Sequence, residues 1–264
     1  VPRARKTNEV RNRRTVYGLY LTIDSNCAAC SVSNTHVSLS HHFHVPAHGR
    51  CSSVFVTHGH TDHSHYLTHM KSRSKPPNVY LPEEIVPRME SFIDAAQQLT
   101  SNLSPEEYET IPWDVSYVLK GVQSQQRVVV NKKRGLVCDI VRCDHTVPCV
   151  GYCFQQVKTS LKQEYVGLPG REIGKLRREG VEVTIEVDEP MFCFLGDTTT
   201  SILEGPDANK IFSCPTIIIE CSFLTEDCRE KAESSKHVLY PDLKPYIESH
   251  PDTTFVLTHF SHRW

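Results

Sequence analysis

The sequence predicts a layered α/β fold, and three observations carry that prediction. The chain has 264 residues, 39% of them hydrophobic, which suits one large core or two small ones. Short apolar runs rich in Val, Ile, Phe and Tyr recur along the chain and are typical of strands. Fewer segments show the three- and four-residue apolar spacing of helices. There is no fixed-period repeat and no linker composition, so we expect one layered domain.

The expected elements follow in order along the chain. Residues 1–15 are basic and have no apolar face to bury, so we expect a flexible arm, and residues 16–264 are expected to form one domain. Strands are expected at 17–23, 37–39, 53–57, 79–81, 127–130, 136–141, 151–154, 181–187, 191–195, 216–220 and 254–258. Helices are expected at 83–99, 171–178 and 240–249.

Composition excludes several classes of protein. No apolar run approaches the roughly 18 residues that a membrane span needs, and no apolar segment follows the basic start, so neither a span nor an uncleaved secretory signal is expected. The 29 basic and 31 acidic residues give a net charge of −2, which predicts no strongly basic surface overall. Eleven scattered cysteines indicate reduced, buried thiols in an intracellular protein. Histidine is unusually frequent, at 15 residues.

The most informative stretch is the HxHxDH motif that follows the expected strand at 53–57. It places His58, His60, Asp62 and His63 within six residues, and Gly59 allows a tight backbone between them. Imidazole and carboxylate groups together suit Zn²⁺ and similar divalent ions. A row of such groups on a loop at a strand end can serve two adjacent ions.

Six residues cannot fill the coordination shells of two ions, so further ligands are expected from distant strand ends. Three candidates follow or lie inside apolar runs, namely His145, Asp197 and His259. Each of them taken alone also fits an ordinary loop residue.

The order HxHxDH, His145, Gly196-Asp197-Thr198, His259 resembles the ligand order of the metallo-β-lactamase superfamily. The resemblance implies an α/β fold of the αβ/βα four-layer sandwich type, with a dinuclear metal site at one edge. It also implies two Zn²⁺ ions, with Mn²⁺ as an alternative. In that arrangement, one ion is held by His58, His60 and His145, the other by Asp62, His63 and His259, and Asp197 bridges them.

Other stretches are similar to tRNase Z, the tRNA 3′-processing endoribonuclease, and especially to its short, plant-type form. They are His145 to Tyr152, Ile219 to Phe223, the lone His237, and His259 to Arg263. The similarity covers roughly residues 16–264. It implies hydroxide attack on a phosphodiester of precursor tRNA, leaving a tRNA 3′-hydroxyl and a trailer 5′-phosphate.

The resemblance also implies roles for individual residues. Glu220 and His237 would form the pair that protonates the leaving oxygen, and Asp62 would assist the attacking water. tRNase Z enzymes carry a tRNA-gripping arm where this chain has residues 158–185. The expected phosphate contacts are Lys158, Lys162, Arg171, Lys175, Arg177, Arg178 and Arg263.

Two features depart from the family pattern. Ser40 stands where the family usually has an early Asp that supports the metal site, and the loss of this carboxylate is expected either to weaken metal binding or to be covered by nearby histidines. Surface or supporting roles are expected for those histidines, which are His41, His42, His44 and His48. The single CxxC of Cys27 and Cys30 lacks a second pair, so buried thiols are the better interpretation than a zinc knuckle.

Two alternative functions stay open at this point. One is another hydrolase of the superfamily, acting on a thioester or a small phosphodiester. The other is a degenerate, non-catalytic member that binds RNA. We expect precursor tRNA as the partner and no association with a membrane. The expected location is intracellular, in the nucleus or cytoplasm, with an organelle as an open alternative. A homodimer is also left open.

Overall fold

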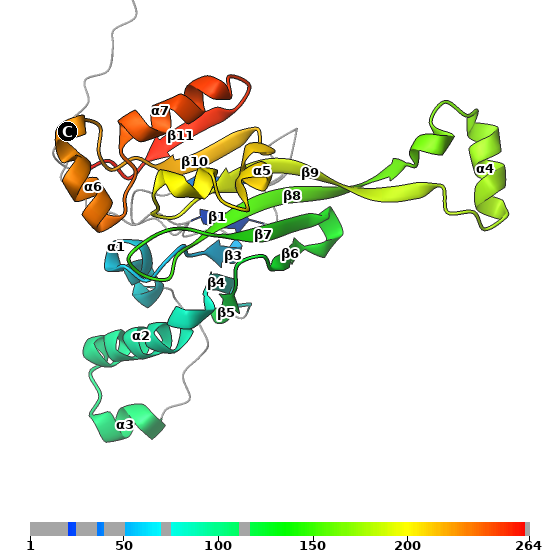
Figure 1. The fold of residues 1–264 in the computed structure, drawn as a ribbon. Coiled ribbons are helices and arrows are strands. Elements are labelled where there is room, and N and C mark those ends of the chain that lie inside the picture. The colour runs from blue at the N-terminus through cyan, green and yellow to red at the C-terminus, as the bar shows by residue number, and fades with distance from the viewer. Residues whose placement is uncertain (1–20, 25–35, 40–50, 70–74, 111–116, 262–264) are drawn as a thin grey trace, which may run out of the picture.

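The computed structural model describes residues 21–24, 36–39, 51–69, 75–110 and 117–261, and it contains two β-sheets flanked by helices (Figure 1). The strand order is β2-β1-β3-β4-β5 in the first sheet and β11-β10-β9-β8-β7-β6 in the second. The predicted basic arm at 1–15 and the residues Ser40, His41, His42, His44, His48, Cys27, Cys30 and Arg263 lie outside the described residues.

The first sheet combines antiparallel and parallel pairing. β1 pairs antiparallel with β2 and β3, whereas β3, β4 and β5 run parallel. β5 was not expected, because Lys120 and Gly121 interrupt its short apolar pattern. The strands of this sheet are β1 (Leu21–Asp24), β2 (His36–Leu39), β3 (Cys51–Phe55), β4 (Asn78–Pro82) and β5 (Val118–Val122).

The second sheet is antiparallel from β6 to β9 and parallel from β9 to β11. The prediction of separate strands at 181–187 and 191–195 is wrong, because both belong to β9. A register shift opposite Phe154 and Gln155 accommodates Pro190, which reads as a strand break in the sequence. The strands are β6 (Arg127–Asn131), β7 (Leu136–Arg142), β8 (Val150–Leu161), β9 (Thr184–Phe194), β10 (Thr216–Glu220) and β11 (Thr254–Thr258).

The three predicted helices are present. They are η2 (Glu83–Ile85) continuing into α2 (Val86–Thr100), α4 (Gly170–Arg178) and α7 (Tyr240–Ser249). Four short α-helices were not predicted, because segments of four to seven residues are too short to show a helical period. The remaining helical segments are α1 (Thr61–Ser64), η1 (His65–His69), α3 (Pro105–Thr110), η3 (Lys132–Arg134), η4 (Gln163–Tyr165), η5 (Thr200–Leu203), α5 (Ala208–Phe212), η6 (Glu226–Cys228) and α6 (Arg229–Ser235).

The two sheets pack face to face through aromatic side chains. Phe55 of the first sheet contacts Tyr152 and Phe154 of the second, with ring centroids 5.1 and 4.9 Å apart. The Tyr152 hydroxyl also donates to the Val56 carbonyl oxygen at 2.7 Å, so a polar contact crosses the same interface. Because neighbouring strand residues point to opposite faces, Val54 and Val56 turn outward from this interface.

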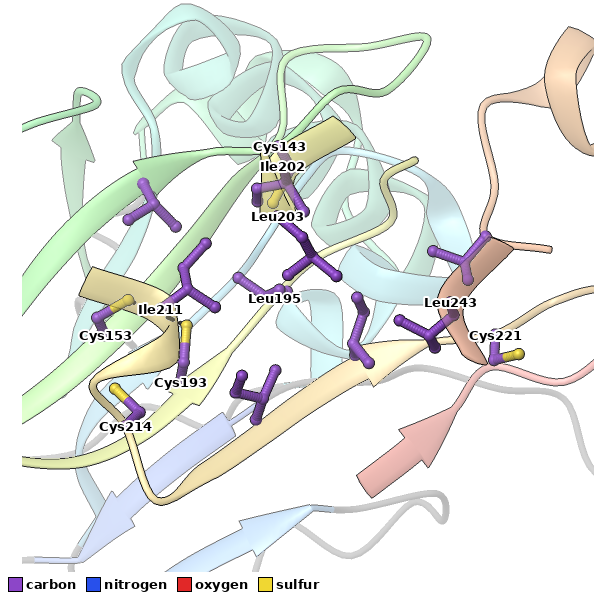
Figure 2. Packing of buried hydrophobic residues seen from close by; sticks show 14 of the residues in the cluster. Cys143, Cys153, Cys193, Leu195, Ile202, Leu203, Ile211, Cys214, Cys221 and Leu243 are labelled. Carbon is purple, nitrogen blue, oxygen red and sulfur yellow. Dashed lines mark hydrogen bonds between the residues drawn. The ribbon is translucent and has the colours of Figure 1, made fainter. Parts of the chain in front are cut away.

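Helices cover the two outer faces. On the first sheet, Met89 and Ile93 of α2 pack against Val54. On the second, Ile211 of α5 and Leu243 of α7 lie in a cluster with the outward side chains of β9 and β10 (Figure 2). The order is therefore helices, sheet, sheet, helices, and the predicted αβ/βα four-layer arrangement is confirmed.

Cysteines fill much of the outer core of the second sheet (Figure 2). Within the described part of the chain, the eight cysteines whose side chains are placed are all buried and unpaired, as the sequence predicts. Cys153 and Cys193 face each other across β8 and β9, with their sulfur atoms 3.0 Å apart. Across the same described ranges, no helix is long and apolar enough to cross a membrane.

A long hairpin extends away from the two sheets (Figure 1). β8 and β9 remain paired as far as Leu161 and Thr184, and α4 lies at the far end between them. No residue of α4 is buried. The outer part of the hairpin lies where the arm is expected, at 158–185. Its first strand, β8, is longer than the strand expected at 151–154.

Candidate metal centre and active site

The HxHxDH loop is joined to two neighbouring loops by backbone contacts. His58 forms an antiparallel bridge with Cys149, which joins the loop to the segment that carries His145. Gly196 allows the turn before Asp197 to approach as well, because a Cβ there would lie 2.7 Å from Thr57 and 2.5 Å from the Cys149 sulfur. Glycine at 196 thus brings three candidate ligand segments to one edge of the sheets.

Three imidazoles converge on one point in a first group. The Nδ1 atom of His60 lies 3.0 Å from Nε2 of His58 and 3.3 Å from Nε2 of His145. Ligand nitrogens about 2.0–2.1 Å from a tetrahedral Zn²⁺ ion are separated by about 3.4 Å, so this spacing suits one ion. An oxygen of Asp197 lies 3.7 Å from His58 Nε2 and completes a group of four.

A second group of possible ligands consists of Asp62, His63 and His259. The Nε2 atoms of the two histidines are 3.1 Å apart, and a carboxylate oxygen of Asp62 lies 3.5 Å from the first and 3.6 Å from the second. The Oδ2 atom of Asp197 is 3.5 Å from both of these nitrogens. Because Asp197 also approaches the first group, its carboxylate can bridge ions held in the two groups.

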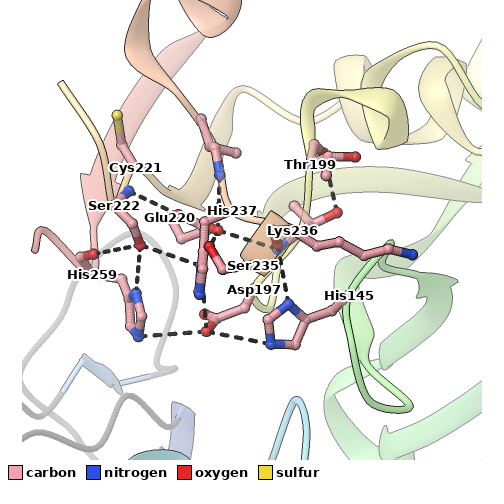
Figure 3. Close-up of polar contacts among 12 residues, drawn as sticks. His145, Asp197, Thr199, Glu220, Cys221, Ser222, Ser235, Lys236, His237 and His259 are labelled. Atoms are coloured by element: carbon pink, nitrogen blue, oxygen red, sulfur yellow. Dashed lines mark hydrogen bonds and ion pairs between the residues drawn. The ribbon is translucent and has the colours of Figure 1, made fainter. Parts of the chain in front are cut away.

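Hydrogen bonds on the far side of two rings determine which nitrogen carries the proton. His145 Nδ1 lies 3.1 Å from the Lys236 carbonyl oxygen, which can only accept, so Nδ1 donates and Nε2 keeps its lone pair. The Ser222 hydroxyl donates to the His259 carbonyl oxygen at 3.0 Å and therefore accepts from His259 Nδ1 at 2.9 Å. Both rings are thus oriented with Nε2 toward the cluster (Figure 3), which is the orientation that metal-binding histidines require.

The protonation of the cluster also suits cations. Burial lowers the pKa of His63 to about 3 and that of His145 to about 4, so both imidazoles are neutral near pH 7. Burial raises the pKa of Asp197 to about 7. Burial opposes a charge on His259, yet the Asp62 carboxylate 3.6 Å from its Nε2 and the other nearby carboxylates raise its pKa to about 9. A bound divalent ion would take the place of that proton and supply the positive charge that the carboxylates lack.

Glu220 and His237 form a hydrogen-bonded pair beside the two groups of possible ligands (Figure 3). Glu220 ends β10, is 2% exposed, and accepts from His237 Nδ1 at 2.7 Å. It also accepts backbone N–H bonds from Thr198, Ser222 and Val238, which compensate for burying the carboxylate. Burial opposes protonation of His237, but the Glu220 hydrogen bond and charge raise its pKa. His237 can therefore hold a proton on Nε2 near neutral pH.

Two residues around the cluster have left-handed backbones without being glycine. They are Lys236, with φ 53°, and His259, with φ 60°. Side chains disfavour this region, and such conformations concentrate at functional sites. Both residues lie in the segments that carry His237 and His259, as expected where the fold holds functional side chains in fixed positions.

Known proteins with similar sequences are tRNase Z and ribonuclease Z enzymes. No protein-family profile matches the chain. The chain is 25% identical to tRNase Z TRZ1 of Arabidopsis thaliana over 217 residues, which are 80% of this chain and 73% of that protein. It is 30% identical to Nuclear ribonuclease Z of Triticum aestivum over 148 residues, which are 52% of this chain and 77% of the wheat protein. The chain belongs to the ribonuclease Z family.

Among solved structures, human tRNase Z, short form (ELAC1), aligns over 80% of this chain and 73% of its own length. The TM-score is 0.47 and the sequence identity 18%. The similarity to ribonuclease Z that the sequence motifs indicate is confirmed by the curated relatives.

The structure divides the predicted site residues of this ribonuclease Z family member into two sets. It brings together His58, His60, Asp62, His63, His145, Asp197, Glu220, His237 and His259. It does not bring the basic residues to that cluster, because Lys158, Lys162, Arg171, Lys175, Arg177 and Arg178 lie on the hairpin arm. Some of these cations have acidic partners there, since Lys158 pairs with Glu189 and Lys175 lies 3.8 Å from Glu179.

Sequence reasoning missed a polar network that connects the ligand loops of the ribonuclease Z site. Asp144 accepts from Lys236 Nζ at 2.7 Å and from the Thr199 hydroxyl at 2.9 Å. It thereby ties the loop of His145 to those of Asp197 and His237. The available signal was weak, because it consisted only of opposite charges directly before His145 and His237.

Proposed function

We propose that the chain is a metal-dependent endoribonuclease that removes the 3′ trailer from precursor tRNA. The products are a tRNA with a 3′-hydroxyl and a trailer with a 5′-phosphate. The observation that carries the proposal is the buried Glu220–His237 pair beside a His/Asp cluster, in a chain of the ribonuclease Z family. A hydrolase of small esters would not need a buried proton donor held by a carboxylate next to the cluster.

The donor set supports two Zn²⁺ ions, with Mn²⁺ as an alternative that the same ligands accept. His58, His60 and His145 would hold one ion, Asp62, His63 and His259 the other, and Asp197 would bridge them. When bound, two such ions activate hydroxide as the nucleophile and stabilise the charge that develops during in-line displacement at phosphorus.

The chain's own residues supply the proton steps. His237 gives its Nε2 proton to the departing 3′-oxygen of the tRNA, and Glu220 keeps the ring oriented and protonated through Nδ1. Asp62 has an oxygen facing the second ligand group and is half-buried, so it can orient or deprotonate the attacking water. Asp62, Glu220 and His237 are therefore the proposed catalytic residues.

The hairpin arm supports contact with the body of the tRNA. Its helix α4 has no buried residue and carries most of the basic residues proposed to contact phosphates, with Lys158 and Lys162 nearer the sheets. Arg263, proposed to approach a phosphate near the cut, lies outside the described residues. The relatives include a nuclear ribonuclease Z of wheat and a chloroplastic tRNase Z of Arabidopsis thaliana, which supports an intracellular location, with the nucleus, the cytoplasm and an organelle as the alternatives.

The direct test uses the purified chain with a 3′-extended precursor tRNA, a mature tRNA and a small generic phosphodiester, each with and without a chelator. Cleavage of the precursor alone, directly after the discriminator nucleotide and abolished by the chelator, is the expected result. Mass spectrometry of the protein should find two divalent ions per chain. Cleavage of the small ester without cleavage of the precursor would overturn the proposal in favour of another hydrolase of the superfamily.

A further inference from the structure

Asp144 and Lys236 form an ion pair beside the His/Asp cluster, and none of the roles proposed above uses it. The Asp144 carboxylate accepts from Lys236 Nζ at 2.7 Å. Asp144 directly precedes His145 of the first ligand group. Lys236 directly precedes His237, the proposed proton donor. The ion pair therefore links the backbone at a possible metal ligand to the backbone at the proton donor.

The two imidazoles that follow these residues lie close together. The ring centroids of His145 and His237 are 5.1 Å apart. The carbonyl oxygen of Lys236 lies 3.1 Å from His145 Nδ1, so the residue before the donor also contacts the ligand (Figure 3). A proton donor must stay within hydrogen-bond reach of the atom that it serves. A shift of the Lys236 backbone would therefore change both the position of the donor and its distance from the ligand.

The backbone of Lys236 has a conformation that side chains disfavour. The residue ends α6 with φ 53° and ψ 57°, in the left-handed region where glycine is favoured. Any other residue there costs free energy, and the contact of the Lys236 ammonium with Asp144 offsets part of that cost. Glycine would keep the carbonyl oxygen in place for His145 but would lose the contact with Asp144.

Asp144 is fixed from another direction by the loop of Asp197. Its other carboxylate oxygen accepts from the Thr199 hydroxyl at 2.9 Å. Its backbone N–H group donates to the Thr198 hydroxyl at 3.0 Å. Both threonines directly follow Asp197, the proposed bridging ligand. Lys236 is thus tied to a carboxylate whose position is set by two loops that carry possible ligands.

The exposure of the ion pair indicates that its main effect is on position and not on stability. The side chains of Lys236 and Asp144 are 44% and 43% exposed. An ion pair with this much contact with water contributes little to the free energy of unfolding. It nevertheless restricts where the end of α6 can lie relative to His145. A small displacement of a group that takes part in the reaction can slow it strongly while the fold stays intact.

We propose that Asp144 and Lys236 are positioning residues, whose ion pair holds His237 where it can give its proton to the leaving oxygen. The inference rests on the proposed function. In that reaction hydroxide forms a bond to phosphorus, the bond from phosphorus to the 3′-oxygen breaks, and that oxygen takes the Nε2 proton of His237. The pair is assigned no part in holding the ions, because neither side chain belongs to the groups of possible ligands.

The test compares two precursor tRNAs that differ only in the leaving atom, which is the 3′-oxygen in one and a sulfur in its place in the other. A thiolate departs without a proton, because thiols ionise at a pKa of about 8.5. The sulfur substrate therefore removes the need for a proton donor. His237→Ala is the reference variant for loss of the donor. It should slow cleavage of the oxygen substrate by about 10² and cleavage of the sulfur substrate by less than about threefold.

Three variants break the ion pair in different ways. Asp144→Asn and Lys236→Met remove one charge each, whereas Lys236→Gly removes the charge and suits the left-handed backbone. Each should lower kcat on the oxygen substrate about tenfold, and change KM and the rate on the sulfur substrate by less than about twofold. Metal content should stay as in the wild type, and Lys236→Gly should unfold at no lower a temperature.

Combinations and controls make the assignment specific. Asp144→Asn and Lys236→Met together should lose no more activity than either alone, because both remove the same contact. Lys236→Arg restores the ion pair and should restore kcat. The matched control is Lys244→Gln, which removes an exposed ion pair between Lys244 and Glu248 on α7 and should change neither rate.

Equal losses on the two substrates, loss of metal, or a lower unfolding temperature of Lys236→Gly would each overturn the inference, because the pair would then support the fold or the metal centre. An unchanged kcat on the oxygen substrate would also overturn it. If the wild type cleaves neither precursor, the proposed function fails, and NMR then follows the Nδ1 proton that His237 donates to Glu220. A shift of that resonance in the three variants but not in Lys244→Gln would support the positioning by itself; the same resonance in all five proteins would reject it.

Discussion

Two clusters of charged and polar groups in this molecule are satisfied in opposite ways. At the interface of β6, β7 and β8, Arg127 donates from Nε to Asp139 at 2.6 Å and from a terminal nitrogen to its other oxygen at 2.9 Å. Gln155 donates to the same carboxylate at 3.0 Å. A second carboxylate, on Asp188, lies 2.7 Å from Arg127, so each of these charges has a partner of the opposite sign.

The His/Asp cluster has no such complement. Its imidazole nitrogens face one another at 3.0 to 3.3 Å, and the Nδ1 atom of His60 has at most one proton to share between His58 and His145. His63 Nδ1 is buried and has no hydrogen-bond partner among the described residues. The comparison teaches that the Arg127–Asp139 network completes itself within the chain, whereas the His/Asp cluster is arranged around something that comes from outside it.

The largest effect is expected from Asp197→Asn. The substitution keeps the size of the side chain but removes the charge that faces both ligand groups, so cleavage should fall by about 10²–10³. Metal analysis should find fewer than two ions per chain. A variant that keeps both ions and full activity would show that Asp197 does not bridge them.

A smaller loss of activity is expected from His237→Ala. Removing a proton donor should slow cleavage by about 10² while the metal content stays unchanged. Since the donor acts when protonated and Glu220 raises its pKa, wild-type activity should fall as the pH rises through that raised pKa. The variant should lose this alkaline limb. Loss of metal from His237→Ala would mean that the ring is a ligand.

Asp139→Asn should have the converse pattern, with a change in stability and none in activity. Burial opposes the charge, but the Arg127 hydrogen bond holds the pKa of Asp139 below its usual value. At pH 7 we expect the variant to lose about 1–3 kcal/mol in urea denaturation of the metal-free protein. Because the folded-state pKa is lowered, this contribution is complete above the unfolded pKa of about 3.9 and disappears as the pH falls through the folded value. A difference from the wild type that stays constant down to pH 2 would contradict this origin.

The exposed charges of α4 should give the smallest effect per residue. Replacing Arg171, Lys175 and Arg178 together by Gln should raise KM for precursor tRNA several-fold and reduce its salt dependence by about one unit for each phosphate that is no longer neutralised. Neither kcat nor the unfolding midpoint should change, because none of these residues is buried. An unchanged KM would place the tRNA grip on another surface.

Sequence predicted the elements whose pattern is local. β10 and β11 agree with prediction to the residue, because each is a short apolar run between turn residues. β9 was split in the prediction because only the pairing with β8 shows that Pro190 sits at a register shift. Helices such as α6 depend on packing that a single short segment does not reveal.

The candidate site was predictable to a similar degree. The order of ligand residues predicted the seven possible metal ligands, and the resemblance to tRNase Z predicted the Glu220–His237 pair; the structure brings these side chains together. The Asp144–Lys236 contact joins residues 92 positions apart and leaves no periodic trace in the sequence. The same holds for the proton positions on His145 and His259, which depend on a carbonyl oxygen and a hydroxyl from other loops.

The pairing of His63 with His259 has a consequence for the timing of synthesis. These two rings lie 196 residues apart in the chain, and His259 directly follows β11, which among the described strands pairs only with β10. While the ribosome has not yet released residue 259, the second ligand group lacks a member. A chain interrupted before residue 259 would therefore carry the first ligand group without a complete second one.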